Sequence, residues 1–91
     1  MRLRWSSRAA SDLVRLSEFL RPVNPAAAAR TVIGLTKAPE RLLSMPRLGE
    51  PLEGFEGREV RRLLVNAYEI HYELADDEIL IIRVWHTRED R

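Results

Sequence analysis

The sequence predicts an α+β fold: a short N-terminal strand, a helical hairpin and a three-stranded antiparallel meander, in the order β-α-α-β-β-β. Two helical patterns meet at a proline-containing stretch at residues 21–25, and three β-patterned segments follow with only two or three residues between them. Hydrophobic residues make up 45% of the 91 positions. That content suffices for one modest core, so we expect a single domain over residues 1–91.

The first strand is expected at Arg2–Trp5, where Leu3 and Trp5 alternate with two arginines. Ser6 or Ser7 can then cap a helix whose buried side carries apolar residues at 4-3-4 spacing, namely Ala9, Leu13, Leu16 and Leu20. We expect the charged residues of this helix to lie on its solvent-exposed face, namely Arg8, Asp12 and Arg15.

A second helix is expected to begin at Asn24 and Pro25, because asparagine caps a helix and proline favours its first position. Gly34 is expected to permit a close crossing of the two helices. Pro39 lacks a backbone donor and clashes with the preceding turn, so the helix should kink or restart near Ala38. An apolar face is formed by Ala28, Val32, Leu35 and Leu42.

Residues 46–57 contain three glycines and two prolines, which predicts one irregular loop. We expect its apolar residues to anchor it to the body of the protein, namely Leu48, Leu52 and Phe55. Three strands should follow at Arg58–Val65, Tyr68–Leu74 and Glu78–Trp85. The short turns between them require antiparallel neighbours.

The last two strands differ in pattern. The middle strand alternates, and we expect solvent on the face that carries Glu69, His71 and Glu73. The last strand is apolar on both parities, which predicts cover on both sides. The helical hairpin can supply one cover. The second has no obvious source in the chain, so we expect the remaining apolar surface to be an interaction site.

Composition excludes several classes of function. The net charge of +1 is too small for a large uniform nucleic-acid-binding face, and the absence of cysteine removes disulfides and thiolate chemistry. The longest apolar run, Ile79–Ile82, is too short to span a bilayer, so we expect a cytoplasmic protein with no membrane role. Phosphate-loop and serine-hydrolase motifs are absent, and His71 and His86 lack metal-ligand spacing. We therefore expect no cofactor and no metal.

Arginines are the remaining candidates for a site. Three arginines lie at the start of the second expected strand of the chain, namely Arg58, Arg61 and Arg62. They either face a target or pair with glutamates across the strands. A second group, Arg83 and Arg88, flanks His86 where the last strand ends. Arg83 lies in an apolar segment, so it requires a charged partner, either within the chain or on a bound molecule.

Short motifs in a fixed order resemble the RelE/ParE toxin superfamily over nearly the whole chain. They are W-S-x-x-A-x-x-D-L at residues 5–13, N-P-x-x-A at 24–28, P-x-x-G at 46–49, R-E-V at 58–60, Y-E-I-H-Y at 68–72 and I-I-R-V-W-H at 81–86. The resemblance implies the toxin of a type II toxin–antitoxin pair. It also implies a cognate antitoxin, ParD-like or of another family, whose C-terminal segment wraps the toxin.

The superfamily has two branches with different targets. The R-V-x-H ending looks more like ParE, which implies inhibition of DNA gyrase by binding, through a surface drawn from Arg58, Arg61, Arg62, Arg83, His86 and Arg88. The alternative is a RelE-like enzyme that cleaves messenger RNA on the ribosome, for which the candidate catalytic residues are Arg61, Arg83 and His86. A non-toxic relative that acts only as a binding module is a third interpretation.

Overall fold

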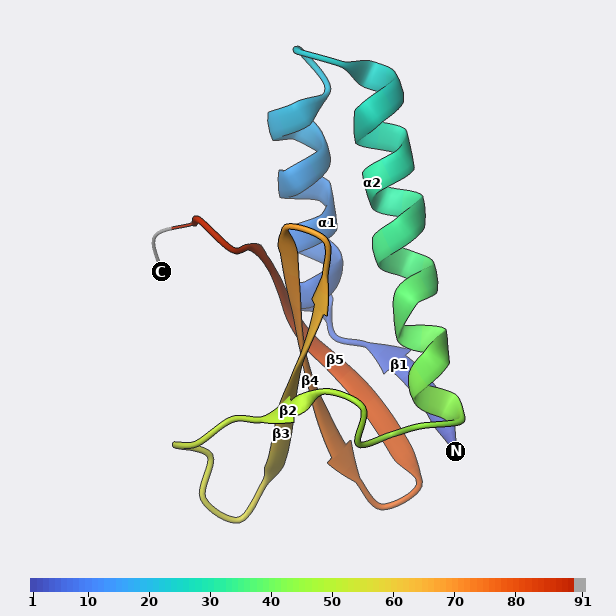
Figure 1. The fold of residues 1–91 in the computed structure, drawn as a ribbon, viewed down its shortest axis with the longest axis vertical. Helices are drawn as coiled ribbons and strands as arrows, with labels where there is room; N and C mark the ends of the chain where they lie inside the picture. The colour runs from blue at the N-terminus through green and yellow to red at the C-terminus, as the bar shows by residue number, and fades with distance from the viewer. Residues whose placement is uncertain (90–91) are drawn as a thin grey trace.

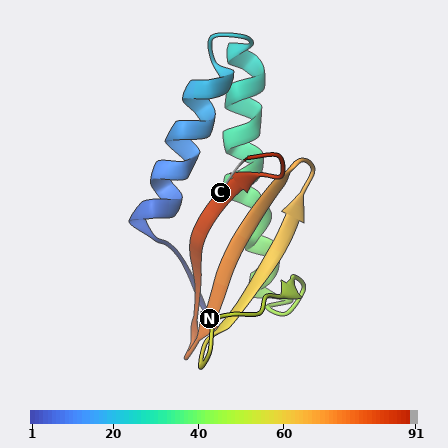
Figure 2. The same cartoon turned by 90° about the vertical axis from the view of Figure 1, so that its left-hand side faces the viewer.

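The structure, a computed structural model that describes residues 1–89, has a helical hairpin packed on one face of a β-sheet (Figures 1 and 2). This confirms the predicted α+β fold. The elements are β1 (Arg2–Trp5), α1 (Ser7–Leu20), α2 (Pro25–Lys37), the 3-10 helix η1 (Ala38–Leu43), β2 (Glu50–Pro51), β3 (Glu59–Val65), β4 (Tyr68–Ala75) and β5 (Glu78–His86). The hairpin extends beyond the end of the sheet in both views. No helix within residues 1–89 is long and apolar enough to cross a membrane.

The sheet has five strands in the order β1-β5-β4-β3-β2. The predicted antiparallel meander is confirmed, with strand boundaries within one residue of those expected. β1 pairs in parallel with only the first part of β5, from Arg2 opposite Glu78 to Trp5 opposite Ile81. The second half of β5 therefore continues past the end of β1.

Local sequence signals explain the helix boundaries. The Ser6 hydroxyl accepts a hydrogen bond from the Ala9 amide at 3.0 Å, and the Asn24 side chain accepts one from the Ala27 amide at 3.0 Å. The predicted restart near Ala38 is confirmed, because α2 ends at Lys37 and η1 begins at the next residue.

A β-bulge explains part of the apolar pattern of the last strand. Tyr72 lies opposite Ile81 and His71 lies opposite Arg83, so Ile82 is an extra residue in β5. The extra residue brings Val84 onto the same face as Ile81. Leu80 and Ile82 lie outside the core and are only partly buried, so the expected full cover on both sides is not observed. One core receives Ala9, Leu16, Leu35, Leu42, Leu63, Ile70, Tyr72, Ile79, Ile81 and Val84.

The loop before β3 is held by hydrogen bonds between its backbone and the Tyr72 hydroxyl, and not by Leu48. The fully buried Tyr72 hydroxyl donates to the Pro46 carbonyl at 2.8 Å and accepts from the Gly49 amide at 2.9 Å. The predicted role of Leu48 as an anchor is wrong, since it is 38% exposed. The short strand β2, which pairs with β3, was not predicted, because two residues containing a proline give no strand pattern.

Two further expectations are wrong. Gly34 does not permit a close helix crossing, because a Cβ atom built there would meet no atom within 4 Å. The outer face of β4 is not solvated, since Glu69 is 4% exposed and His71 stacks edge-on against Trp85 at 4.7 Å between ring centroids. A charged residue can be covered in this way when neighbouring strands supply polar partners.

The glycines provide a test of this packing. A Cβ atom at Gly49 would lie 2.6 Å from the Arg62 carbonyl oxygen and 2.9 Å from the Tyr72 ring. Gly49→Ala should therefore reduce the free energy of unfolding in urea by roughly 1–3 kcal/mol. Gly34→Ala is the control and should increase it by about 0.5–1 kcal/mol. Equal stability of the two variants would contradict the packing described.

Candidate partner-binding groove

Asp12 and Arg83 form a two-pronged ion pair between α1 and β5. The Arg83 Nε donates to one Asp12 oxygen at 2.9 Å, and a terminal guanidinium nitrogen donates to the other at 3.1 Å. Asp12 is 4% exposed, so its predicted position on a solvent-exposed face is wrong. Arg83 has the charged partner that its apolar segment requires, and that partner lies within the chain. Arg83 also lies over the Trp85 ring, 4.4 Å from the centroid.

Asp12 also supplies an acceptor to the uncovered edge of β5. The Val84 amide donates to its carboxylate at 2.8 Å, where a neighbouring strand would otherwise bond. Burial alone would raise the pKa of Asp12, but hydrogen bonds from Arg83, the Val84 amide and Arg15 outweigh that effect and hold the pKa below its usual value. The carboxylate is therefore charged at neutral pH.

Arg15 connects the same edge to the C-terminal segment. Its guanidinium donates to Asp12 at 3.1 Å, to the Val84 carbonyl at 3.2 Å, and to Glu89 in an ion pair. Glu89 also accepts from the His86 amide at 2.8 Å. These contacts fold residues 87–89 back against α1.

A groove of about 510 Å³ lies between the end of α1 and the C-terminal segment. It has an apolar floor and a charged rim, and it is lined by Arg15, Leu16, Phe19, Leu20, Tyr68, His86, Arg88 and Glu89. Phe19 is 79% exposed. His86 packs edge-on against Tyr68 at 5.1 Å between ring centroids, which holds its ring at the rim. We call this surface the α1 groove.

Sequence reasoning found only His86 and Arg88 of the α1 groove. The sequence nevertheless contained a signal for Asp12, which bonds the groove residue Arg15 but does not itself line the groove. Asp12 falls three residues after Ala9 and four before Leu16, on the buried stripe itself. Phe19 falls three residues after Leu16, so its spacing did not reveal that it is exposed.

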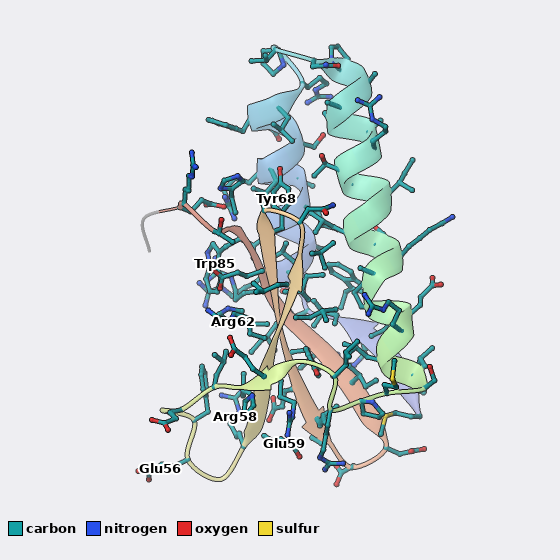
Figure 3. All side chains as sticks on the ribbon, in the orientation of Figure 1. Glu56, Arg58, Glu59, Arg62, Tyr68 and Trp85 are labelled. Carbon is teal, nitrogen blue, oxygen red and sulfur yellow. The ribbon has the colours of Figure 1, made fainter. Side chains whose placement is uncertain are left out.

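The three arginines at the start of β3 are paired within the chain. Arg58 forms a fork with Glu73 at 2.9 and 3.0 Å and thereby lowers the pKa of that carboxyl. Arg61 donates to Glu59 and to the Gly49 carbonyl, at 2.9 and 2.7 Å. Arg62, labelled with Arg58 in Figure 3, pairs with Glu50 and lies 3.7 Å from Glu69.

The candidate catalytic residues Arg61, Arg83 and His86 are not brought together. Arg61 bonds the loop before β3, Arg83 bonds α1, and His86 lines the α1 groove. The sequence did not predict another arrangement of charged residues. Side-by-side register positions on three adjacent strands are occupied by Arg62, His71 and Arg83. His71 also lies 3.0 Å from Glu69.

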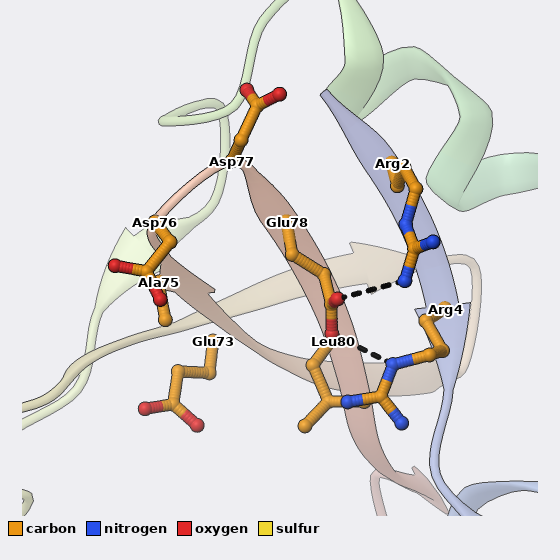
Figure 4. A pocket seen from close by; sticks show the side chains of 8 residues that line it. All are labelled: Arg2, Arg4, Glu73, Ala75, Asp76, Asp77, Glu78 and Leu80. Atoms are coloured by element: carbon orange, nitrogen blue, oxygen red, sulfur yellow. Dashed lines mark hydrogen bonds and ion pairs between the residues drawn. The ribbon is translucent and has the colours of Figure 1, made fainter.

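A second hollow, of about 480 Å³, lies at the opposite end of the sheet near the β4–β5 turn (Figure 4). Most of its charges are paired: Glu78 bonds Arg4 at 2.7 Å and Arg2 at 3.3 Å, Glu73 pairs with Arg58, and Asp77 lies 3.6 Å from the N-terminal amine. It offers no apolar floor comparable to that of the α1 groove. Within residues 1–89 no group of three or more histidine, cysteine or carboxylate side chains is close enough to hold a metal ion.

Six basic residues form no ion pair within the described part of the chain: Arg8, Arg21, Arg30, Lys37, Arg41 and Arg88. Three of them lie on α2 and η1, and α2 contains no acidic residue. Positive charge without an internal partner therefore lies on both helices of the hairpin, on η1 and beside the α1 groove, and not on the outer face of the sheet.

The fold and the groove define a small α+β protein in which a helical hairpin and a meander sheet frame a surface groove. The chain belongs to the ParE toxin family of type II toxin–antitoxin systems, whose family model, described as the ParE toxin of the parDE system, matches residues 3–91. It is a type II toxin of the ParE/RelE superfamily, as the sequence motifs predicted.

Proteins named after both branches resemble this chain. The chain is 32% identical over 83 residues to Toxin RelE2 of Caulobacter vibrioides, and the match covers 91% of each protein. It shares a fold with a chain of the chromosomal ParDE system of P. aeruginosa, with a TM-score of 0.80, 22% identity and coverage of 94% and 95% of the two chains. A chain of the Mycobacterium tuberculosis RelBE2 toxin–antitoxin complex gives a TM-score of 0.57 at 25% identity, covering 92% and 87%.

The Asp12 contacts can be tested by substitution. Asp12→Ala should lower the free energy of unfolding by roughly 2–4 kcal/mol, because it leaves the Arg83 guanidinium and the Val84 amide without their acceptor. Urea denaturation at pH 7 measures the change. Glu18→Ala, which removes an exposed carboxylate from the same helix, should change stability by less than about 0.5 kcal/mol.

The pH dependence of this stability difference tests whether the charge of Asp12 is responsible for it. The folded-state pKa of Asp12 is lowered, so its contribution is complete above the unfolded pKa of about 3.9 and is lost as the pH falls through the folded value. The stability difference between wild type and Asp12→Ala should therefore shrink below about pH 4. An undiminished difference under strongly acidic conditions would show that the carboxylate charge is not what stabilises this edge.

Proposed function

We propose that this toxin inhibits DNA gyrase by binding and that a cognate antitoxin neutralises it by occupying the α1 groove. The dispersal of Arg61, Arg83 and His86 over three places is the observation that most supports binding over hydrolysis. General acid–base catalysis requires the reacting groups within hydrogen-bond reach of one substrate. A binder requires only a shaped surface.

The α1 groove suits a protein segment as its occupant. Its floor offers Leu16, Leu20 and the exposed Phe19 ring, and a helix or extended segment can bury such residues as anchors. His86 and Arg88 lie on the rim, so an occupant of the groove would also cover them. Both residues belong to the predicted gyrase-facing surface, which gives the antitoxin a simple way to block the target.

Messenger RNA cleavage on the ribosome is the second candidate function. The 32% identity to Toxin RelE2 favours it, as does the row of Arg62, His71 and Arg83, where a histidine lies between two arginines. Both arginines already pair with carboxylates, which reduces the positive charge that they can offer to RNA.

A gyrase supercoiling reaction tests the proposal. Purified toxin should slow supercoiling or accumulate cleaved DNA, it should leave ribosome-bound messenger intact, and the antitoxin encoded beside its gene should restore gyrase activity. Arg88→Glu should lose inhibition by about tenfold or more, because it reverses a charge on the gyrase-facing surface. Messenger cleavage with gyrase unaffected would contradict the proposal and favour the ribosomal target. Inactivity in both assays would favour the third interpretation, a non-toxic relative that acts only as a binding module.

Two variants separate antitoxin binding from target binding. Phe19→Asp should still inhibit gyrase but should escape the antitoxin, because it places a charge on the apolar floor of the groove. Val14→Asp is the matched control: Val14 is 57% exposed on α1 but does not line the groove, so this variant should remain sensitive to antitoxin. Equal sensitivity of both variants would place the antitoxin elsewhere on the toxin.

A further inference from the structure

A second groove adjoins the α1 groove on the other side of Tyr68. It has a volume of about 260 Å³ and lies between α2 and the β3–β4 turn. Tyr68, labelled in Figure 3 at the upper end of the sheet, lines both grooves, so the two grooves meet at this side chain. We call the second one the α2 groove. Its walls include Ala27, Arg30, Thr31, Gly34 and Asn66.

Gly34 lines the α2 groove and lies beside open space. A Cβ atom there would meet nothing within 4 Å, so no packing requirement within the described chain explains a glycine in the middle of a helix. Glycine at such a position destabilises a helix relative to alanine. The space beside it is large enough to accept a side chain of a bound partner.

Charge indicates the chemistry of that partner. Arg30 lines the α2 groove, Lys37 lies two helical turns further along the same side, and neither forms an ion pair within residues 1–89. The helix that carries them has no acidic residue. An occupant with carboxylates would therefore meet cations that no group of the chain neutralises. Ile33 is 56% exposed and places apolar surface between the two cations. This favours a polypeptide as the partner over a phosphate backbone.

We infer that the antitoxin segment continues from the α1 groove across Tyr68 into the α2 groove, where it inserts a side chain beside Gly34 and presents a carboxylate to Arg30. This inference rests on the antitoxin proposed above and extends its binding site to the second helix. One continuous segment over both grooves would contact both helices of the hairpin and the end of the sheet.

Binding of the purified antitoxin to toxin variants, measured by calorimetry, tests the inference. Gly34→Leu should weaken binding by at least about tenfold, because leucine fills the space that the partner would occupy. Its thermal unfolding temperature should not fall, since a Cβ atom at this position meets no atom within 4 Å and leucine favours a helix more than glycine does. Ala29→Leu is the matched control: Ala29 is exposed on α2, about 140° around the helix from Gly34, so this variant should bind like wild type.

A charge variant gives an independent readout. Arg30→Glu should weaken binding by about tenfold and reduce its dependence on salt concentration, whereas Arg8→Glu, at an unpaired arginine on the other helix, should change neither. If the wild type binds the antitoxin and both Gly34→Leu and Arg30→Glu bind it with the same affinity, this inference is overturned and the proposed function stands. No binding of antitoxin to the wild type would overturn both.

Discussion

The hydrogen bond from the Val84 amide to the buried Asp12 carboxylate is the contact on which the rest of the structure depends. β5 is longer than its neighbour β1, so its second half would expose unpaired backbone groups. Side chains of the first helix and its cap replace the missing strand. The Ser6 hydroxyl donates to the Ile82 carbonyl at 3.1 Å, and Arg15 donates to the Val84 carbonyl at 3.2 Å. The helical hairpin is thereby fixed to the sheet by polar contacts as well as by the core.

This edge also shapes the surface that we assign to the antitoxin. Arg15 bonds Asp12 on one side and Glu89 on the other, so the contact that secures α1 also places the C-terminal segment beside Phe19. The arginine of the R-V-x-H ending, Arg83, completes the same network from β5. The ion pair with Asp12 explains how an arginine is tolerated in an apolar strand. A substitution of Arg83 would remove this ion pair, so the stability of such a variant has to be measured before its binding to a target is interpreted.

Periodicity predicted the parts of the fold that repeat regularly, and failed where a single residue breaks the repeat. The hairpin, the restart at Pro39 and the antiparallel meander follow from spacing and turn chemistry. The bulge at Ile82 and the two-residue strand β2 do not, because each depends on a partner distant in sequence. Spacing places Asp12 on the buried stripe, but the groups that bond its carboxylate, Arg83 and the Val84 amide, are distant in sequence. For the same reason the sequence located His86 and Arg88 on a surface but not the groove around them, which needs α1 and Tyr68 to meet.

Amide hydrogen exchange at Val84, followed by NMR, tests the role of Asp12 most directly. The Val84 amide should be protected in the wild type to a degree comparable with the core strand amide of Ile70, although it lies beyond the end of β1. In Asp12→Ala its exchange should accelerate by at least about tenfold relative to Ile70, since the acceptor is gone. A Val84 amide that exchanges in the wild type as fast as the amides of the exposed turn at Asp76 and Asp77 would contradict the account.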